Sequence, residues 1–479
     1  MNPIRKIKIS LCLGLLLLMC GACEDWLSVS PKSEVKYDDL FSNRNGFKDQ
    51  LTGIYTAMCA KETYGGNVTF GAVDAVGQYY YLEGSRVNKY YYISRFEYDN
   101  STCETIFKEM WGKMYNAIVN VNILLKGIED HPGVLSSGEK DIYKGEALGL
   151  RAFLHFDLLR MFGKSYKAGA SEPAIPYVKA ISKEVTPLST VDQTLEAIIR
   201  DLEDAAGLLE KDPIRTGEAT TAFLGTRAFH LNYYAVKALL ARVYLYRNDK
   251  VNALKNAVEV IHAQKFPWVD RGNVTTTERK NRDGIFVTEA IFMLNNTLLN
   301  DQVNEFLRPG MSDDQNNVMI VDTDVQDAVF EKDQYGTFDW RNTYYFDVPS
   351  WYGYNTRLWQ YTGMPKAYSN RQPLLRISEM YLIAAECTIN RTEAVGYLNM
   401  LRQHRGIPEE YDFDNDIAEG VLSLEIAKEY RKEFWGEGQW FFYCKRMDQD
   451  DLPNVLVSFK KDYYRFPIPD IEIEYGNRN

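Results

Sequence analysis

The stretch that decides the fold is SSGEKDIYKGEALGLRAFLHFDLLRMFG, residues 136–163. Ser136 and Glu139 form a capping box, in which two side chains satisfy backbone N–H groups left free at a helix start. Gly163 then follows as a stop signal. Between them, apolar residues recur at helical spacing: Ile142, Leu150, Phe153, Leu154, Leu158 and Met161. The stretch therefore predicts one long amphipathic helix.

Similar signals on both sides predict more helices. Ser101-x-x-Glu104 and Thr190-x-x-Gln193 each resemble a capping box before an apolar pattern. Residues 239–261 and 380–401 both have the pattern of a helix, a short polar turn and a second helix. A clean 34-residue period is absent, yet these patterns favour a helix-dominated fold of tetratricopeptide-like helix pairs with minor β structure.

Two long irregular regions interrupt the helices, at residues 64–100 and 266–372. Both are rich in aromatic and turn residues, and loops of this length are usually functional or contain small strands. Alternation over residues 285–292 predicts one short strand. We expect one domain over residues 46–479, with an N-terminal half at about 46–265 and a C-terminal half at about 266–479.

The first residues have the pattern of an export signal. A short basic region precedes an apolar run over residues 9–19, which is too short to cross a membrane. Gly21 and Ala22 are small residues suited to a peptidase, and Cys23 follows them. This order predicts a bacterial lipoprotein in which residues 1–22 are removed and Cys23 is lipidated. Ordinary secretion, with Cys23 an incidental thiol, is the alternative. Residues 23–45 are polar and are expected to form a tether.

Charge and cysteine usage restrict the function classes. The chain of 479 residues has a formal net charge of −11 and no basic stripe, which argues against nucleic acid as a partner. Beyond Cys23, the remaining cysteines are widely spaced and form no metal-ligand pattern: Cys59, Cys103, Cys387 and Cys444. They could form disulfides or remain isolated thiols.

Signs of catalysis are weak. The five histidines are scattered, and no Gly-x-Ser-x-Gly or phosphate-binding glycine-rich loop is present. We expect a protein that is not an enzyme and needs no cofactor. Asp322-x-Asp324-x-Gln326 and Asp412-x-Asp414-x-Asp416 resemble the start of a calcium loop, but both lack its glycine and final glutamate. Calcium therefore remains only an alternative to solvated acidic loops.

The best candidate for a binding site is aromatic. Between Phe338 and Tyr361, ten of 24 residues are aromatic, and charged or amide side chains lie between them. Flat aromatic rings can cover the apolar face of a sugar ring, while polar groups satisfy its hydroxyls. In this stretch we select Asp339, Trp340, Arg341, Tyr344, Trp351, Tyr354 and Trp359. The alternative is that part of these aromatics pack a loop or meet a partner protein.

The order and spacing of four segments, together with the lipoprotein-like start, resemble the SusD-like (SusD/RagB) outer-membrane lipoproteins of glycan-foraging Gram-negative bacteria. The segments are residues 145–163 (GEALGLRAF…DLLRMFG), 376–386 (RISEMYLIAAE) with 398–406, 429–446 (Glu-x-Arg-x-Glu, Glu-Gly and Lys-Arg) and 466–473 (FPIP with Glu-Ile). Tyr430, Trp440 and Tyr443 depart from the family pattern and are expected to be helix-packing positions. We expect Glu386, Arg402, Glu433 and Glu437 to form partly buried ion pairs.

The resemblance implies a function. In that family a scaffold of helix pairs sits as a lid on a SusC-like TonB-dependent transporter barrel and captures ligand for import. It implies a lipid-anchored protein on the outer face of an outer membrane that binds an oligosaccharide. The family's ligand face uses comparable loops, so Asp74, Tyr79, Tyr80 and Trp268 are secondary candidates. Two alternatives remain open: the ligand could be a peptide, or the chain could be a helical scaffold that binds only protein.

Overall fold

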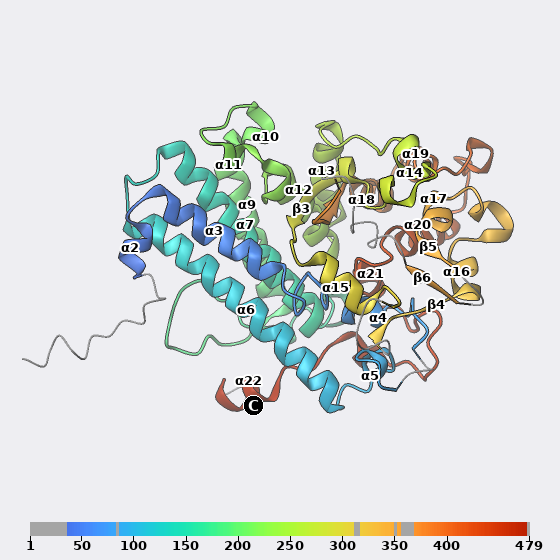
Figure 1. Ribbon diagram of the computed structural model, residues 1–479, viewed down its shortest axis with the longest axis horizontal. Coiled ribbons are helices and arrows are strands. Elements are labelled where there is room, and N and C mark those ends of the chain that lie inside the picture. Colours follow the sequence, from blue (N-terminus) through green and yellow to red (C-terminus); the bar gives the residue numbers. More distant parts are fainter. Residues whose placement is uncertain (1–35, 83–85, 311–316, 349–351, 356–367, 477–479) are drawn as a thin grey trace, which may run out of the picture.

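The computed structural model describes residues 36–82, 86–310, 317–348, 352–355 and 368–476 (Figure 1). A series of long helices forms the scaffold, and each packs against a neighbour along the chain. In order they are α3 (Arg44–Met58), α6 (Ser101–Asp130), α7 (Ser137–Phe162), α9 (Val191–Leu208), α12 (Tyr233–Tyr246), α13 (Lys250–His262), α18 (Ile377–Cys387), α19 (Arg391–Gln403), α20 (Glu419–Glu433) and α21 (Gln439–Met447). This arrangement confirms the predicted tetratricopeptide-like fold.

The helix starts follow the sequence signals with one exception. The capping boxes at Ser136 and Thr190 both form, at the starts of α7 and α9. For α6, however, the cap is Asn100, whose side chain accepts a hydrogen bond from the backbone N–H of Thr102. The predicted capping box at Ser101 is therefore wrong by one position, because Asn100 already satisfies the helix start.

Helix α7 is the centre of the N-terminal half. It contacts α6 on one side and α9 on the other, and most of its residues are buried. A Cβ atom at Gly149 would lie 2.5 Å from a methyl carbon of Leu231, so any larger residue there would require the Leu231 side chain to move. Residues 137–162 therefore form a helix buried within the bundle.

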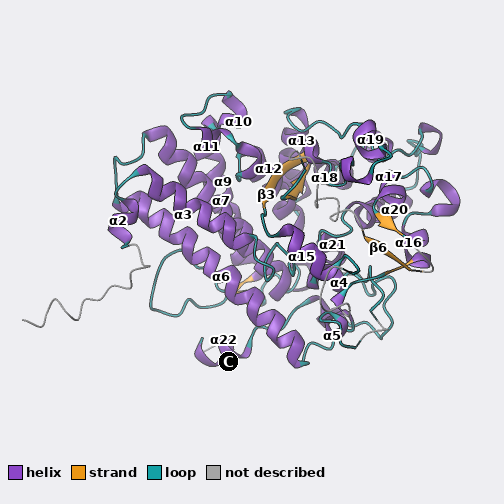
Figure 2. Cartoon of the chain, viewed as in Figure 1, coloured by secondary structure: helices purple, strands orange, loops and turns teal. Residues whose placement is uncertain are grey.

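Strands are few and short, and Figure 2 shows them set among helices. The main pair joins β3 (Ala290–Asn295) to β7 (Arg371–Arg376), antiparallel. A second small sheet has the order β4–β6–β5. Its strands are β4 (Val321–Asp322), β5 (Phe346–Asp347) and β6 (Tyr352–Asn355), and the last pair in the structure is β1 (Pro173–Ile175) with β2 (Ser189–Thr190).

The strand predicted over residues 285–292 is partly wrong. A short 3₁₀ turn occupies Val287–Glu289, and the strand begins only at Ala290. Phe286, just before the turn, has a φ of 55° in the left-handed region. The backbone therefore turns where the apolar alternation favoured extended chain.

Short helices complete the structure. In the N-terminal half they are α2 (Tyr37–Phe41), α4 (Ala72–Val76), α5 (Tyr91–Ser94), α8 (Tyr166–Gly169), α10 (Pro213–Thr216) and α11 (Ala222–Gly225). In the C-terminal half they are α14 (Arg271–Thr275), α15 (Leu299–Phe306), α16 (Thr323–Val329), α17 (Trp340–Tyr344), the 3₁₀ helix η9 (Lys461–Tyr464) and α22 (Asp470–Tyr475). No helix among the described residues has both the length and the apolar character to span a membrane.

The predicted tether, residues 23–45, extends too far toward the C-terminus. Phe41 in α2 is fully buried, and the Tyr37 hydroxyl donates a hydrogen bond to Asp130, 2.9 Å away at the end of α6. Residues 37–45 therefore belong to the helical scaffold, because an apolar side chain there anchors them. Cys23 lies outside the described residues.

The four remaining cysteines are free thiols. Cys59, Cys103, Cys387 and Cys444 are each buried, and none is bonded to another. Burial raises the pKa of the Cys59 thiol to about 12. Of the two alternatives from the sequence, the structure therefore shows isolated thiols.

Candidate functional site

The first predicted ligand residues, Asp339 and Arg341, are fully buried in the C-terminal half. Arg341 makes two hydrogen bonds to Asp339, of 2.7 and 3.0 Å, and contacts Glu429 and Glu433 of α20 at 2.8 and 2.9 Å. Their assignment to a ligand surface is therefore wrong. Their charges are neutralised inside the protein by carboxylates from a distant part of the sequence.

These two residues belong to a larger buried set that we call the arginine–glutamate network. Glu433 is at its centre and contacts Arg341, Arg376 and Arg405. The members of the network are Glu289, Asp339, Arg341, Arg376, Arg405, Glu429, Glu433 and Glu437. Burial opposes ionisation of Glu433, but Arg405 and Arg376 more than offset it and hold its pKa well below the usual range. The network fastens α17 and β7 to α20.

The predicted ion pairs are confirmed for three of four residues. Glu433 and Glu437 lie in the network, and Glu386 contacts Arg446 at 2.7 Å. Arg402 instead places its guanidinium 3.9 Å from the ring centre of Phe413 and donates to the backbone carbonyl of Tyr411. The positions that depart from the family pattern (Tyr430, Trp440 and Tyr443) are buried against one another, as predicted.

Trp340 and Tyr344 are half-buried at the two ends of α17. The indole ring of Trp340 covers Gly406, because a Cβ atom added at Gly406 would lie 2.1 Å from the indole nitrogen. The backbone N–H of Trp340 donates a hydrogen bond to the backbone carbonyl of Arg405. The Tyr344 ring faces the guanidinium of Arg282 at 4.8 Å. Both side chains thus pack against the protein in part. Neither lines the cavity described below.

Tyr354 is half-buried on β6, in the small sheet. Trp351 and Trp359, the other two aromatic candidates of this stretch, lie outside the described residues. The assignment of these three residues to a ligand surface stays a prediction.

Asp74 is fully buried in α4, so the prediction that it contacts ligand is wrong. Its carboxylate accepts hydrogen bonds from the backbone N–H groups of Gly436 and Gly438, at 3.1 and 3.2 Å, and also bonds to Tyr80. Burial raises the pKa of Asp74 to about 7. Gly438 has a φ of +70°, which favours glycine in this turn between α20 and α21. Asp74 therefore joins the two halves of the protein.

Tyr79 is also buried, and it belongs to the core. Its ring stacks on Trp435 at 4.4 Å between centres, and its hydroxyl donates to the backbone carbonyl of Arg431 at 2.6 Å. Its stacked ring face and its hydroxyl are thus engaged within the core. Tyr79 nevertheless also lines the cavity described next, so its assignment to the ligand surface stays a prediction.

That cavity has a volume of about 280 Å³, and we call it the tyrosine cavity. Four segments form it: the turn after α4, the end of α5, the start of α16 and the stretch before η9. Its lining residues are Gln78, Tyr79, Tyr80, Tyr81, Leu82, Ser94, Arg95, Asp322, Val325, Asn454, Leu456 and Val457. Of the predicted ligand residues, the cavity thus brings together Tyr79 and Tyr80.

The walls combine apolar and polar groups. Tyr81 is half-buried and is held by a backbone hydrogen bond to Ile320, 2.8 Å long, beside β4. Leu456 is 68% exposed at the rim. Arg95 and Asp322 contribute opposite charges, and Asp322 also caps α16. Such a mixture suits a neutral, amphipathic molecule with hydroxyl groups better than a purely apolar one.

Trp268 is not part of this cavity. Its ring stacks on His404 at 4.7 Å between centres and lies 4.8 Å from the ring centre of Tyr381 on α18. It is half-buried and packs against the scaffold. Trp268 therefore lies apart from the tyrosine cavity, and its assignment as a ligand contact stays a prediction.

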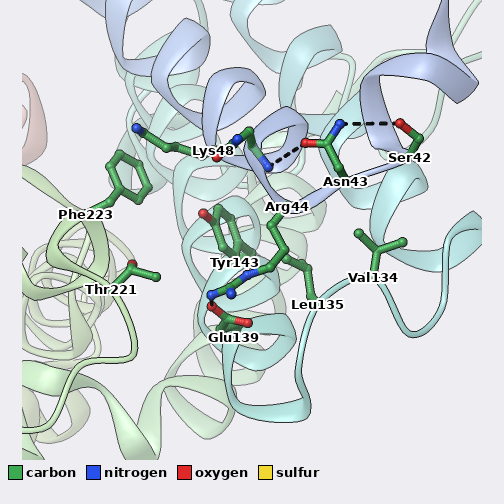
Figure 3. Close-up of a pocket in the computed structure, with 11 residues that line it drawn as sticks. Ser42, Asn43, Arg44, Lys48, Val134, Leu135, Glu139, Tyr143, Thr221 and Phe223 are labelled. Carbon is green, nitrogen blue, oxygen red and sulfur yellow. Dashed lines mark hydrogen bonds and ion pairs between the residues drawn. The ribbon is translucent and has the colours of Figure 1, made fainter.

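A larger cavity of about 770 Å³, the bundle-end cavity, lies by α3 in the other half of the molecule (Figures 1 and 3). Figure 3 shows Arg44 turned to Glu139, with which it forms an ion pair, and Lys48 near Phe223. The distance from the Lys48 nitrogen to the Phe223 ring centre is 5.5 Å. We favour the tyrosine cavity as the candidate site, because its walls combine tyrosine rings with polar side chains and come from both halves of the chain.

The possible calcium loops have other roles in the structure. Asp322 accepts from the backbone N–H of Asp324, and Gln326 donates to the side chain of Asn342 at 2.7 Å. Asp412 accepts from Gln403 at 2.6 Å. In the part of the chain that is described, no three metal-ligating side chains converge.

Sequence reasoning missed Arg95, Asn454 and Leu456. Leu456 itself belongs to none of the motifs named from the sequence, so only its position in the fold reveals its role. Arg95 could have been noticed, because it lies in the aromatic region 64–100 that was already expected to be functional.

Comparisons with known proteins agree with this architecture. A family model described as "Starch-binding associating with outer membrane" matches residues 25–245, and the SusD family model matches residues 323–467. A SusD-like protein of Formosa agariphila is 22% identical over 291 residues, which are 61% of this chain. The matched part spans about half (51%) of that relative.

Solved structures share the fold over nearly the whole chain. A SusD-like carbohydrate binding protein from Bacteroides vulgatus has a TM-score of 0.71 at 20% identity, covering 91% of this chain and 97% of that one. The surface glycan-binding protein A from Bacteroides thetaiotaomicron, solved with laminarihexaose, has a TM-score of 0.68 at 18% identity, covering 90% and 98%.

Each of the two matched segments contributes walls of the tyrosine cavity, with Tyr81 in the first and Leu456 in the second. Together with the shared fold, these matches show that the chain belongs to the SusD-like (SusD/RagB) family.

Proposed function

We propose that this chain is a lipid-anchored, surface-exposed protein of the outer membrane that binds an oligosaccharide in the tyrosine cavity. It would pass the glycan uncleaved to a SusC-like TonB-dependent transporter. The observation that carries the proposal is the tyrosine cavity itself, which both family segments build from aromatic and polar side chains.

The chemistry of the walls fits a sugar. Tyr81 and Leu456 offer apolar surface to the C–H face of a pyranose ring, and Arg95, Asp322 and Asn454 can bond to hydroxyl groups. The solved complex of the glycan-binding relative with laminarihexaose supports a carbohydrate as the ligand class. A modest affinity suits the role, because the ligand must leave again for the transporter.

The test is calorimetric titration of the full-length chain in detergent against oligosaccharides and short peptides. We expect saturable binding of a glycan that is recovered intact. Tyr81→Ala combined with Leu456→Ser should weaken this binding at least about tenfold, because it removes apolar contact area from both walls. Tyr81 is held through its backbone, so the fold should tolerate alanine there.

The matched control changes the bundle-end cavity instead. Phe223→Ala with Lys48→Ala should leave glycan binding unchanged. Loss of binding in the control alone would move the site to the cavity of Figure 3. Binding of peptides but not glycans would favour the peptide alternative, and cleavage of the ligand would contradict a pure binding role. Binding of neither class, with transporter association retained, would favour the protein-only scaffold.

A further inference from the structure

A third cavity, distinct from the two above, is lined by an excess of basic side chains. It has a volume of about 400 Å³ and lies between α8, the end of α21 and η9; we call it the lysine cavity. Its lining residues are Lys164, Ser165, Lys167, Ala168, Lys445, Asp448, Lys461, Asp462, Tyr464 and Arg465. Five of them are basic and two are acidic.

Lys445 is the most unusual member, because it is 1% exposed. Its ammonium group donates to the backbone carbonyls of Arg160 and Gly163, at 2.5 and 2.6 Å, where α7 ends. Within the described ranges no carboxylate lies within 4.0 Å of it. Burial, and then the positive charges of Arg465 and Arg160, lower its pKa well below the usual range. A buried cation is thus held beside like charges.

The other cations divide into two groups. Lys461 is paired with Asp448 and Asp450, each at 2.9 Å, and Lys164 lies 3.7 Å from Glu172. Lys167, by contrast, donates to the backbone carbonyl of Met447. Arg465 has no ion pair among the described residues, and neither has Asp462. Three cations therefore remain without a carboxylate partner, against one such acid.

Tyr464 provides a second, independent sign of a ligand. It is 4% exposed, and its ring is fixed between Phe441 and Phe459, with ring centres 5.7 and 4.9 Å away. Its hydroxyl is buried and has no hydrogen-bond partner in the described part of the chain. Buried hydroxyl groups without a partner are rare and destabilising, so a bound group that reached this hydroxyl would supply its missing partner.

We propose that the lysine cavity binds a small molecule through an oxyanion, with Lys445, Arg465 and Lys167 supplying the charge and Tyr464 a neutral donor. The volume exceeds what an inorganic anion requires, so an acidic sugar with a carboxylate or a sulfate ester fits it. This site is separate from the tyrosine cavity, so a negative result for anion binding would leave the proposed glycan site unaffected. The alternative role of Lys445 is only to cap α7.

The test is calorimetric titration of the full-length chain in detergent with glucuronate, inorganic sulfate and phosphate, and with glucose as the uncharged control. We expect saturation below roughly 10 mM for at least one anion and none for glucose. Equal binding of sulfate and glucuronate would show that the oxyanion alone is recognised. Tighter binding of glucuronate would show that the sugar body contributes. No saturable binding of any anion would overturn the proposal.

Variants locate the site. Tyr464→Phe removes one oxygen, and Arg465→Gln removes one exposed charge; each should weaken anion binding about tenfold. Lys255→Gln, on the exposed face of α13, makes the same change in net charge and should have no effect. Tyr81→Ala in the tyrosine cavity should also have none. Anion binding that survives both Tyr464→Phe and Arg465→Gln would place it elsewhere and refute the proposal.

A second readout distinguishes binding from capping. An anion beside Lys445 favours its charged form, so anion affinity should fall as the pH rises through the pKa of this group. Titrations with sulfate from about pH 5 to about pH 10, where the charge of sulfate itself is constant, provide the measurement. Affinity that stays constant over this range would contradict a role of Lys445 in binding, even if its mutation unfolds α7.

Discussion

At the scale of single residues, Asp74 shows how the protein environment changes the pKa of a side chain. Its carboxyl group is fully buried, two glycine N–H groups and the Tyr80 hydroxyl surround it, and within the described ranges no ion pair to a cation forms at it. Burial is the largest influence and raises its pKa to about 7. The protonated form is therefore favoured in the folded protein relative to the unfolded chain.

This shift predicts a pH dependence of stability with a definite sign. Because the folded pKa lies above the unfolded value of 3.8, Asp74 favours folding at low pH, and this contribution disappears as the pH rises toward 7. Between pH 4 and pH 8 the natural chain should lose up to roughly 4 kcal/mol of unfolding free energy relative to Asp74→Asn. Denaturant titrations of both proteins across this range provide the measurement. Parallel curves would contradict the prediction.

Asp339 and Arg341 show where sequence reasoning fails for single residues. Among aromatic neighbours, a carboxylate and a guanidinium have the pattern of polar groups around a sugar. Whether they face solvent depends on Glu429 and Glu433, which lie about ninety positions later and neutralise Arg341. No local pattern reveals such a pairing, so a buried network and an exposed binding surface look alike in the sequence.

At the scale of elements, the arginine–glutamate network determines how the loop-rich part is attached. Glu433 on α20 contacts arginines from three other places in the chain. Removing one partner of a buried ion pair leaves the other charge uncompensated, which is strongly destabilising. Glu433→Gln should therefore lower the unfolding free energy by about 3–5 kcal/mol, as measured by denaturant titration.

A matched change at the surface provides the control for Glu433. Glu210 forms an exposed ion pair with Arg215. Glu210→Gln removes the same charge and should cost less than about 1 kcal/mol, because solvent already screens that pair. Equal effects of the two substitutions would show that the network contributes no more than a surface pair.

The elements differ in how well the sequence predicts them. Helices α7 and α9 were predicted from their caps and apolar spacing, both of which are local signals. The sheet of β4, β5 and β6 was not, because its strands are short and owe their pairing to distant segments. The tyrosine cavity falls in the same class: its aromatic wall was predicted, but the wall containing Leu456 was not.

At the scale of the whole molecule, the location of the protein stays a prediction that depends on Cys23. Cys23→Ala should release the chain from the membrane fraction, because the acyl chains that anchor it would be missing. Cell fractionation with detection of the protein is the measurement. On intact cells, the unaltered protein should be digested by an added protease, and resistance would contradict exposure at the surface.

The overall fold was largely predictable, since a series of helix pairs repeats local signals along the chain. The boundary of the tether was not, because the burial of Phe41 depends on contacts of α2 with α3 and α6, which lie later in the chain. Relations between distant segments thus explain the corrections at the tether, at the arginine–glutamate network and at Asp74.

The buried thiols have a practical consequence. Cys59, Cys103, Cys387 and Cys444 are hidden from solvent, and burial raises the pKa of each, so none offers a reactive thiolate near neutral pH. A cysteine introduced at the exposed position of Leu456 would therefore be the preferred target of a maleimide dye among the described residues. A dye attached at position 456 would therefore be nearly free of competing labels on the buried thiols. Its fluorescence could report the binding of a ligand in the tyrosine cavity.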